Sequence, residues 1–135
     1  TGIIHEFIMR VYYEDTDLAG IVYYANYLRF IERARTEWAR ALGIDQARLR
    51  ADDGLVFAVR RIEADYLRPA KFDDTLLIET RPTVVTGARI VLEQVVLKDG
   101  VPLFGAGVTL VCLNETGHAV RLPAELRRNL TPALH

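Results

Sequence analysis

The spacing of hydrophobic residues changes twice along the chain, and each change marks a new kind of element. Residues 3–13 are rich in β-branched and aromatic side chains, which predicts a first strand. Between residues 23 and 42 apolar positions recur at spacings of three and four, which predicts one long amphipathic helix ending near Gly43. From Val56 onward apolar and polar positions alternate between turn sequences. This stretch predicts four more strands, joined mainly as antiparallel hairpins.

The alternation also predicts which side chains share a face of the sheet. In the strand that follows the helix it places Val56, Ala58 and Ile62 on one face and Phe57 and Val59 on the other. Residues 45–52 are polar and arginine-rich, so they predict no more than a helical turn, whereas residues 123–130 predict a short closing helix.

A strand, one long helix and four antiparallel strands define an α+β fold in which the sheet covers the apolar stripe of the helix. This order of elements fits a hotdog fold, a five-stranded antiparallel sheet wrapped around one long central helix. It equally fits cystatin-like and other cone-shaped α+β folds, because periodicity alone does not separate them.

Composition narrows the class of protein. A chain of 135 residues is expected to form a single domain over residues 1–135, because two halves of that size would each have a marginal core. Half of the residues are hydrophobic and 26% are charged, which excludes a disordered or low-complexity chain. The formal net charge of −1 provides no overall positive field, so no nucleic-acid partner is expected.

Cysteine and histidine usage bears on the compartment and on metal binding. The single cysteine, Cys112, has no partner within the chain for a disulfide, which favours a reducing, cytoplasmic location. No apolar run approaches the roughly 20 residues of a membrane-spanning helix. The three histidines lack the spacing of metal ligands, so no metal site is expected.

The densest group of candidate catalytic residues lies between the first strand and the helix. Glu14, Asp15 and Asp17 precede a helix start, where unpaired backbone N–H groups favour negative charge. In one interpretation Asp17 only caps a turn and Gly20 permits a tight bend. In the other, Asp17 is a base or nucleophile, and N–H groups near residues 23 and 24 hold the oxyanion formed from a carbonyl substrate.

Residues 13–27 (YEDTDLAGIVYYANY) resemble the signature of the 4-hydroxybenzoyl-CoA thioesterase family, and most closely its Tol-Pal-associated acyl-CoA thioesterase branch. Residues 32–37 (ERARTE) and 66–70 (YLRPA), followed by Asp73 and Asp74, resemble the same branch. The resemblance therefore extends over nearly the whole chain.

The resemblance implies a hotdog fold and a fixed set of roles around one carboxylate. In such enzymes the second Asp of the Asp-x-Asp pair, here Asp17, is the catalytic carboxylate, acting as nucleophile or as general base. The thioester carbonyl lies at the start of the central helix, so the backbone N–H of Tyr24 would polarise it, and Gly20 would let the loop approach closely. Coenzyme A is part of the substrate, and no cofactor is implied.

Further residues are expected to bind the substrate. The expected substrate-binding set comprises Tyr23, Asn26, Phe57, Val59, Arg60 and Arg89. Among these, Phe57 and its strand are expected to contribute from a partner subunit, and the two arginines could contact coenzyme A phosphates. Arg61, Arg68 and Lys71 are further candidates for phosphate contacts.

The chain departs from the family pattern at two places. Many Tol-Pal-associated members carry His at the position of Tyr24, so a mechanism that needs an imidazole there is not available, whereas one that uses the backbone N–H is. Some relatives carry a basic cluster between the third and fourth strands, where this chain has only Arg89. These departures leave the acyl preference and the branch open.

The resemblance also implies edge-to-edge homodimers, which often pair into homotetramers, and a place in lipid metabolism. Acyl-CoA is the expected small-molecule substrate, with acyl carrier protein as a further partner. Two alternatives remain. A hotdog hydratase or dehydratase would rely on a His with an acidic partner, and the chain has no His between His5 and His118. A non-enzymatic module that binds acyl chains or acyl carrier protein could use the same tunnel.

Overall fold

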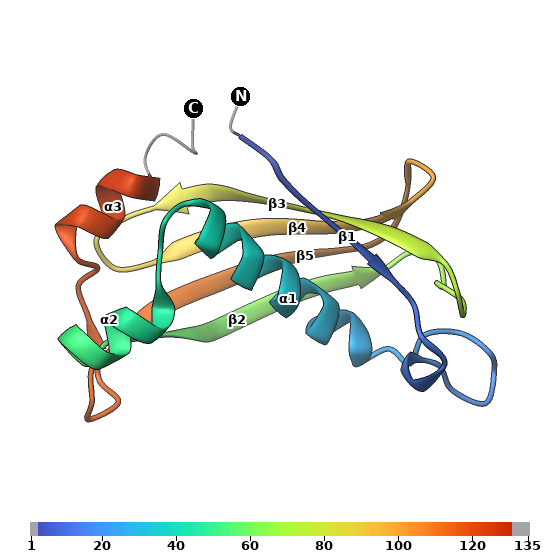
Figure 1. The fold of residues 1–135 in the computed structure, drawn as a ribbon, viewed down its shortest axis with the longest axis horizontal. Helices are drawn as coiled ribbons and strands as arrows, with labels where there is room; N and C mark the ends of the chain where they lie inside the picture. Colours follow the sequence, from blue (N-terminus) through green and yellow to red (C-terminus); the bar gives the residue numbers. More distant parts are fainter. Residues whose placement is uncertain (1–2, 131–135) are drawn as a thin grey trace.

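One antiparallel sheet with a long helix across one of its faces forms the core of the molecule (Figure 1). The computed structural model describes residues 3–130. Within them the strands are β1 (His5–Arg10), β2 (Val56–Tyr66), β3 (Thr75–Val85), β4 (Ile90–Lys98), β5 (Val101–Leu113) and the two-residue β6 (Ala119–Val120). The helices are α1 (Asn26–Ala41), α2 (Gln46–Asp53) and α3 (Ala124–Leu130), and η1 (Tyr13–Asp15) is a single 3₁₀ turn.

The strand order is β1-β3-β4-β5-β2, so β1 and β2 form the two edges of the sheet, while β6 pairs with β5. The chain thus leaves one edge after β1, passes through α1 and α2, and returns at the opposite edge as β2. Figure 1 shows α2 and α3 at one end of the sheet, and the start of α1 with the loop that precedes it at the other end. The predicted α+β class and the five main strands are confirmed, with β6 as a short addition. The first strand is shorter than the predicted range of residues 3–13, because the chain leaves the sheet after Arg10 and turns at η1.

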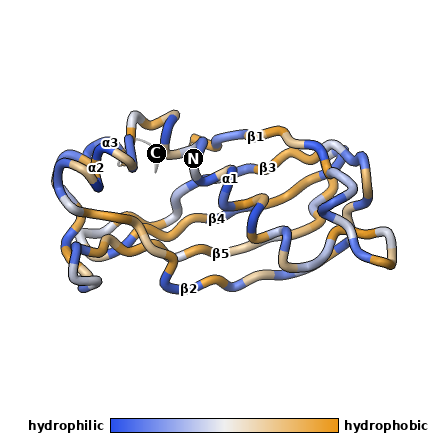
Figure 2. Tube along the Cα trace, turned by 60° about the horizontal axis from the view of Figure 1, so that its bottom comes forward, coloured by the Kyte–Doolittle hydropathy of each residue, from blue (hydrophilic) through white to orange (hydrophobic). Residues whose placement is uncertain are grey.

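The core lies between α1 and the sheet. Helix residues spaced three and four apart, among them Phe30, Ile31 and Ala34, are fully buried because this stripe faces the strands. Figure 2 shows the long strands rich in hydrophobic residues, which supply the opposing side of the core. Trp38 is also buried, as its helical spacing predicts.

A buried amide ties the helix to the sheet. The Gln94 side chain is fully buried, and its Nε2 donates to the Ile31 carbonyl and to Thr80 Oγ1, both at 2.9 Å. Its Oε1 accepts from Arg35 Nη1 at 3.1 Å. This amide therefore connects β4 to β3 and to the middle of α1.

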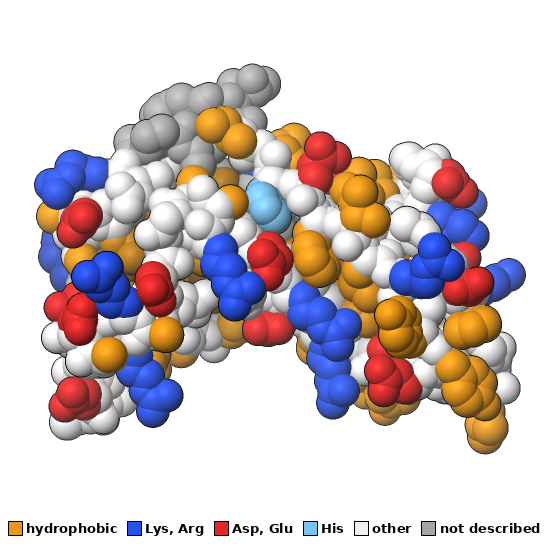
Figure 3. Space-filling model, viewed as in Figure 1, with side chains coloured by type: hydrophobic (Ala, Val, Ile, Leu, Met, Phe, Trp, Pro, Cys, Tyr) orange, Lys and Arg blue, Asp and Glu red, His pale blue; other side chains and the backbone are white. Residues whose placement is uncertain are grey.

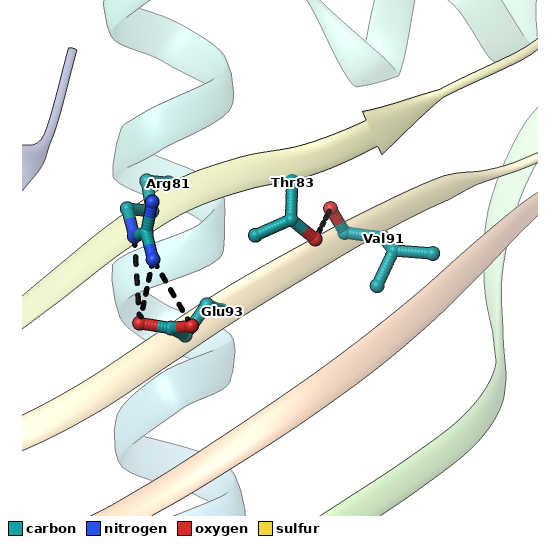
Figure 4. Close-up of polar contacts among 4 residues, drawn as sticks. All are labelled: Arg81, Thr83, Val91 and Glu93. Carbon is teal, nitrogen blue, oxygen red and sulfur yellow. Dashed lines mark hydrogen bonds and ion pairs between the residues drawn. The ribbon is translucent and has the colours of Figure 1, made fainter. Parts of the chain in front are cut away.

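The opposite face of the same strands carries an exposed ion pair. Arg81 on β3 pairs with Glu93 on β4 through both carboxylate oxygens, and nearby Thr83 Oγ1 donates to the Val91 carbonyl (Figure 4). In this view α1 passes behind the strands, so the pair lies on the face of the sheet away from the helix.

Two helix predictions need correction. Helix α1 begins at Asn26 rather than near residue 23, because the Asn26 N–H donates to the Tyr23 carbonyl at 2.8 Å in a turn that precedes the helix. Residues 46–53 form a complete helix rather than a turn. The Asp45 side chain accepts from the Arg48 N–H at 3.0 Å at its start, and Gly54 ends it with a positive φ of 66°. No residue of α2 is buried, so no hydrophobic period signalled it.

The register of β2 also differs from simple alternation. A bulge between Val59 and Arg61 leaves Arg60 as the extra residue. Phe57 is opposite Cys112, Val59 is opposite Leu110 and Ile62 is opposite Val108. Because these three β5 residues are buried against the helix side, Phe57, Val59 and Ile62 share the inner face. The predicted grouping of Ile62 with Val56 and Ala58 was therefore wrong.

Candidate functional site

The loop between β1 and α1, residues 12–25, is held in shape by backbone hydrogen bonds. Asp17 N–H donates to the Ile21 carbonyl at 2.9 Å, and Gly20 N–H donates to the Asp17 carbonyl at 3.0 Å. Gly20 has a φ of +79°, which reverses the chain at little steric cost. Val22 N–H donates to the Ala70 carbonyl at 2.8 Å, which fastens the loop to the segment between β2 and β3.

Asp17 is exposed in this loop, and only one of its two carboxylate oxygens accepts a hydrogen bond from the described residues. Its Oδ1 accepts from the Ala19 N–H at 2.9 Å, which is the local capping contact expected of a turn residue. Among residues 3–130 no donor is recorded for its Oδ2. The side chain therefore combines a fixed position with one oxygen available to another molecule.

Two backbone N–H groups just before α1 have no acceptor among the residues that the structure describes. Within the described part of the chain, no acceptor is recorded for the N–H of Tyr24 or of Ala25. The positive end of the helix dipole lies at the same place. Such N–H groups can donate to a carbonyl oxygen that develops negative charge.

Asn26 and Tyr23 connect the acidic loop to the start of the helix. Asn26 Nδ2 donates to the Asp15 carbonyl at 2.9 Å, and Tyr23 N–H donates to the same oxygen at 3.0 Å. The rings of Tyr23 and Tyr24 lie 4.9 Å apart. The pKa of the Tyr23 phenol is raised, mainly by hydrogen bonding and charge from the Tyr24 side chain. Burial and the Asp17 charge raise it further, to a lesser extent. Asp17 and Tyr23 are thus electrostatic neighbours.

An open cavity of about 320 Å³ lies beside Tyr24. It is lined by Ile21, Val22, Tyr24, Tyr27, Tyr66, Leu67, Arg68 and Pro69. Figure 3 shows hydrophobic side chains gathered on the surface at this end of the molecule. The exposed apolar residues there include Tyr13, Leu18 and Phe72. The lining is mainly apolar with one arginine, a composition suited to an organic substrate.

Tyr66 and Leu67 line this cavity, although the sequence did not predict either of them as a site residue. They belong to residues 66–70, which carry part of the family resemblance. Tyr66 is the last residue of β2, and its ring packs on Phe104 at 4.9 Å and on Tyr27 at 5.5 Å. Its sequence signals were its place within residues 66–70 and at the end of an alternating strand. Its ring contacts come from residues distant along the chain, so neither signal revealed them.

The other expected substrate-binding residues lie away from this loop within one chain. Phe57 and Val59 line a cavity of about 250 Å³ with Glu32 and Arg35 on α1. Nine residues of strand, about 30 Å at 3.3 Å per residue, separate Phe57 from the end of β2. Asp17, Gly20, Tyr23 and Tyr24 therefore share one loop and Asn26 begins the helix that follows it, whereas Phe57 and Val59 do not join them within the chain.

The two arginines expected at the coenzyme A phosphates lie at the end of the sheet opposite the loop. Arg60 lines a cavity of about 290 Å³ together with Gly87, Ala88 and Arg121. Arg89 is exposed in the turn between β3 and β4. Neither residue contacts residues 12–25 within one chain.

Two further features of residues 3–130 bear on metal binding and on membrane insertion. These residues contain no group of three or more His, Cys, Asp or Glu side chains arranged to hold a metal ion. No helix among them is both long enough and apolar enough to cross a membrane.

Comparisons with known proteins place the fold and the loop in context. Residues 19–103 match the model of the thioesterase superfamily. The chain is 44% identical over 108 residues to the acyl-CoA thioesterase YbgC of Haemophilus influenzae, which covers 80% of this chain and 79% of that protein. The crystal structure of a probable thioesterase from Bartonella henselae is similar with a TM-score of 0.86 and 41% identity, covering 90% of this chain and all of that one.

A more distant structure supports the fold alone. A 4-hydroxybenzoyl-CoA thioesterase mutant, solved with 4-hydroxybenzoyl-CoA, matches with a TM-score of 0.87 at 23% identity, over 94% of this chain and 98% of that one. The predicted hotdog arrangement is thereby confirmed.

Proposed function

The chain belongs to the thioesterase superfamily, and we propose that it hydrolyses acyl-CoA thioesters with Asp17 as the catalytic carboxylate. The observation that carries the proposal is the pairing of two complementary groups in one loop. Asp17 has a carboxylate oxygen without a donor among the described residues, and Tyr24, just before α1, has a backbone N–H without an acceptor there. The Asp17 carboxylate can act at a carbonyl carbon. The Tyr24 N–H can donate a hydrogen bond to the carbonyl oxygen as that oxygen gains negative charge.

In the proposed reaction the thioester carbonyl oxygen accepts a hydrogen bond from the Tyr24 N–H. The Asp17 carboxylate then acts on the carbonyl carbon in one of two ways. It attacks the carbon itself and forms an anhydride that water opens, or it removes a proton from a water molecule that attacks. Both routes break the C–S bond, release coenzyme A as a thiolate that takes up a proton, and yield the free acid. Gly20 supports the loop reversal that places Asp17.

The proposal uses the chain's own carboxylate and backbone dipoles, with coenzyme A as part of the substrate and no further cofactor. The mainly apolar cavity beside Tyr24 would hold the part of the substrate next to the thioester. Tyr23 and Asn26 would keep the loop and the helix start in register. A cytoplasmic location is consistent with this substrate and with the unpaired Cys112, which is buried.

A homodimer formed through β2 would complete the site. Strand β2 is an edge of the sheet, so its outer backbone groups are free to pair with a second copy. In an antiparallel pairing about a two-fold axis near the middle of β2, the start of the partner's strand lies beside the end of this one. Phe57 and Val59 of one subunit would then approach Tyr24 and Tyr66 of the other.

The same pairing would bring arginines of the second subunit toward the substrate bound at this loop. We assign Arg60 and Arg89 to the phosphates of coenzyme A on their charge and exposure. Pairs of such dimers would give the homotetramer that the resemblance implies. An acyl carrier protein thioester is the alternative substrate, because its reacting group is the same.

The test is thiol release from short aliphatic, long aliphatic and aromatic acyl-CoAs by wild type and by Asp17→Asn. We expect the substitution to lower kcat by about 10³-fold or more with folding intact, because the amide is neither a nucleophile nor a base at neutral pH. Glu14→Gln is the matched control, since Glu14 is an exposed carboxylate three residues away, and its kcat should stay within about twofold of wild type.

Two results would count against the proposal. If Asp17→Asn kept more than a tenth of wild-type kcat, Asp17 would not be the catalytic group. If wild type bound acyl-CoA tightly and released no thiol from it or from acyl carrier protein thioesters, the non-enzymatic binding module would be the better description.

A further inference from the structure

The hydroxyl group of Tyr66 donates a hydrogen bond to the carbonyl of Tyr24 at 3.0 Å. The two residues are 42 positions apart in the sequence, one at the end of β2 and the other just before α1. The bond therefore connects the edge strand to the peptide segment that carries the proposed carbonyl-binding N–H.

The Tyr24 carbonyl does not take part in the hydrogen-bond pattern of helix α1. In a regular helix the Tyr24 carbonyl would accept from the Leu28 N–H, but that N–H donates to the Ala25 carbonyl instead, at 3.2 Å. Among residues 3–130, the Tyr66 hydroxyl is the donor recorded for the Tyr24 carbonyl. On the other side, the Tyr23 carbonyl accepts from the Asn26 N–H at 2.8 Å.

These two hydrogen bonds fix the peptide groups on both sides of the Tyr24 α-carbon. One peptide group contains the Tyr23 carbonyl and the Tyr24 N–H, and the other contains the Tyr24 carbonyl. When the orientation of both is set, the backbone dihedral angles of Tyr24 are set, and so is the direction of its N–H. The Tyr66 bond acts on the second peptide group, which also carries the Ala25 N–H. Its loss would free that group and leave the backbone at Tyr24 held from one side only.

We propose that Tyr66 is a positioning residue whose hydroxyl, by holding the Tyr24 carbonyl, steadies the backbone that presents the Tyr24 N–H to the thioester carbonyl. The inference rests on the proposed function, because it assigns the N–H a role in that reaction. Tyr66 acts through Tyr24 and does not itself touch the reacting atoms. Its effect should therefore appear in the chemical step rather than in substrate binding.

The surroundings of Tyr66 keep its hydroxyl in place as a donor. Its ring packs against Phe104 and Tyr27 and lies 6.2 Å from the Tyr24 ring, all in edge-to-face geometry. Burial, followed by the nearby Tyr24, raises the pKa of the Tyr66 phenol, so it stays protonated at neutral pH. The ring supplies the packing, and the hydroxyl supplies the hydrogen bond.

Because these two contributions are separate, Tyr66→Phe removes the hydrogen bond and leaves the ring contacts and the cavity wall in place. Loss of a complete oxyanion donor lowers kcat by about 10²- to 10³-fold in well-studied enzymes. Here the donor stays and only its alignment loosens, so we expect a loss of about 10-fold in kcat. KM should stay within about twofold of wild type.

Tyr13→Phe is the matched control. Tyr13 lies at the start of the same loop, its ring packs on Phe72, and among the described residues its hydroxyl has no recorded partner. The experiment measures kcat and KM for wild type, Tyr66→Phe, Tyr13→Phe and Asp17→Asn with one acyl-CoA, and thermal melting confirms that each variant is folded.

The inference is supported if Tyr66→Phe alone of the two tyrosine variants loses kcat at constant KM. It is overturned if Tyr66→Phe keeps kcat within twofold, or if KM rises while kcat is unchanged, since the hydroxyl would then contact the substrate. An inactive Asp17→Asn beside a fully active Tyr66→Phe would remove this inference and leave the proposed function standing. Absence of thiol release by wild type would remove both.

Discussion

The buried amide of Gln94 offers a sharp test of how the helix is held on the sheet. Gln94→Met keeps a side chain of similar length and volume and removes both polar ends of the amide. Three hydrogen bonds disappear, those to the Ile31 carbonyl, to Thr80 Oγ1 and from Arg35. The thioether accepts hydrogen bonds only weakly and donates none, so the three former partners lose their contact.

The expected cost follows from the partners. Each of the two neutral hydrogen bonds contributes about 1 kcal/mol, and the bond from the charged Arg35 contributes about 1.5–3 kcal/mol. Burial lowers the pKa of the Arg35 guanidinium, a sign that this group is poorly hydrated and depends on protein acceptors. The greater hydrophobicity of Met returns about 1 kcal/mol. The net loss in the free energy of unfolding should be about 3 kcal/mol.

The assay is urea denaturation at one fixed protein concentration, since subunit association would otherwise shift the midpoint. For 135 residues the entropy of unfolding is about 0.28 kcal/mol/K, so a loss of about 3 kcal/mol should also lower Tm by about 10 °C. A double-mutant cycle with Thr80→Val should show a coupling of about 1 kcal/mol, because Thr80 and Gln94 share a hydrogen bond.

The adjacent residue provides the control. Glu93 lies on the opposite face of β4, where about half of its side chain is exposed in the pair with Arg81. Glu93→Gln should change the free energy of unfolding by less than about 1 kcal/mol. The reasoning would be refuted if Gln94→Met cost less than about 1 kcal/mol, or if its effect and that of Thr80→Val were simply additive.

Two further predictions concern acid stability and assembly. Burial acts to raise the pKa of Asp74, but hydrogen bonds from Lys98 and from the Lys71 N–H outweigh it and hold that pKa below its ordinary value. This stabilisation is present above the ordinary carboxyl pKa and is lost as pH falls through the lowered pKa. Asp74→Asn should therefore flatten the decline of the free energy of unfolding below about pH 4. An unchanged slope would contradict this. Sedimentation at micromolar concentration should give at least twice the 15.3 kDa mass of the chain, whereas a monomer would exclude the dimer through β2.

Much of the fold could be predicted because its elements are locally periodic. The stripe on α1 and the alternation in β3, β4 and β5 arise from the geometry of a helix and of a strand, and each is complete within a short stretch of sequence. The loop that carries Asp17, Gly20 and Tyr24 could also be recognised from the sequence, because its residues lie close together in one short segment. Its catalytic role remains a proposal.

The prediction failed where no local period existed. Helix α2 buries no residue, so it depends on the Asp45 cap and on Gly54 rather than on a hydrophobic stripe. The bulge at Arg60 adds a residue to one strand and moves Ile62 to the other face from the one that simple alternation assigns. A residue count along one strand does not reveal how its partner strand is paired.

The sequence by itself determined the α+β class, the central helix, the long strands and the acidic loop before that helix. Only the tertiary structure placed Tyr66 on the Tyr24 carbonyl and joined Gln94 to Ile31 and Thr80. These contacts link residues between 14 and 63 positions apart. Local periodicity reports which face of an element is apolar, whereas a hydrogen bond between distant residues depends on how the elements pack, and no short segment of sequence contains that information.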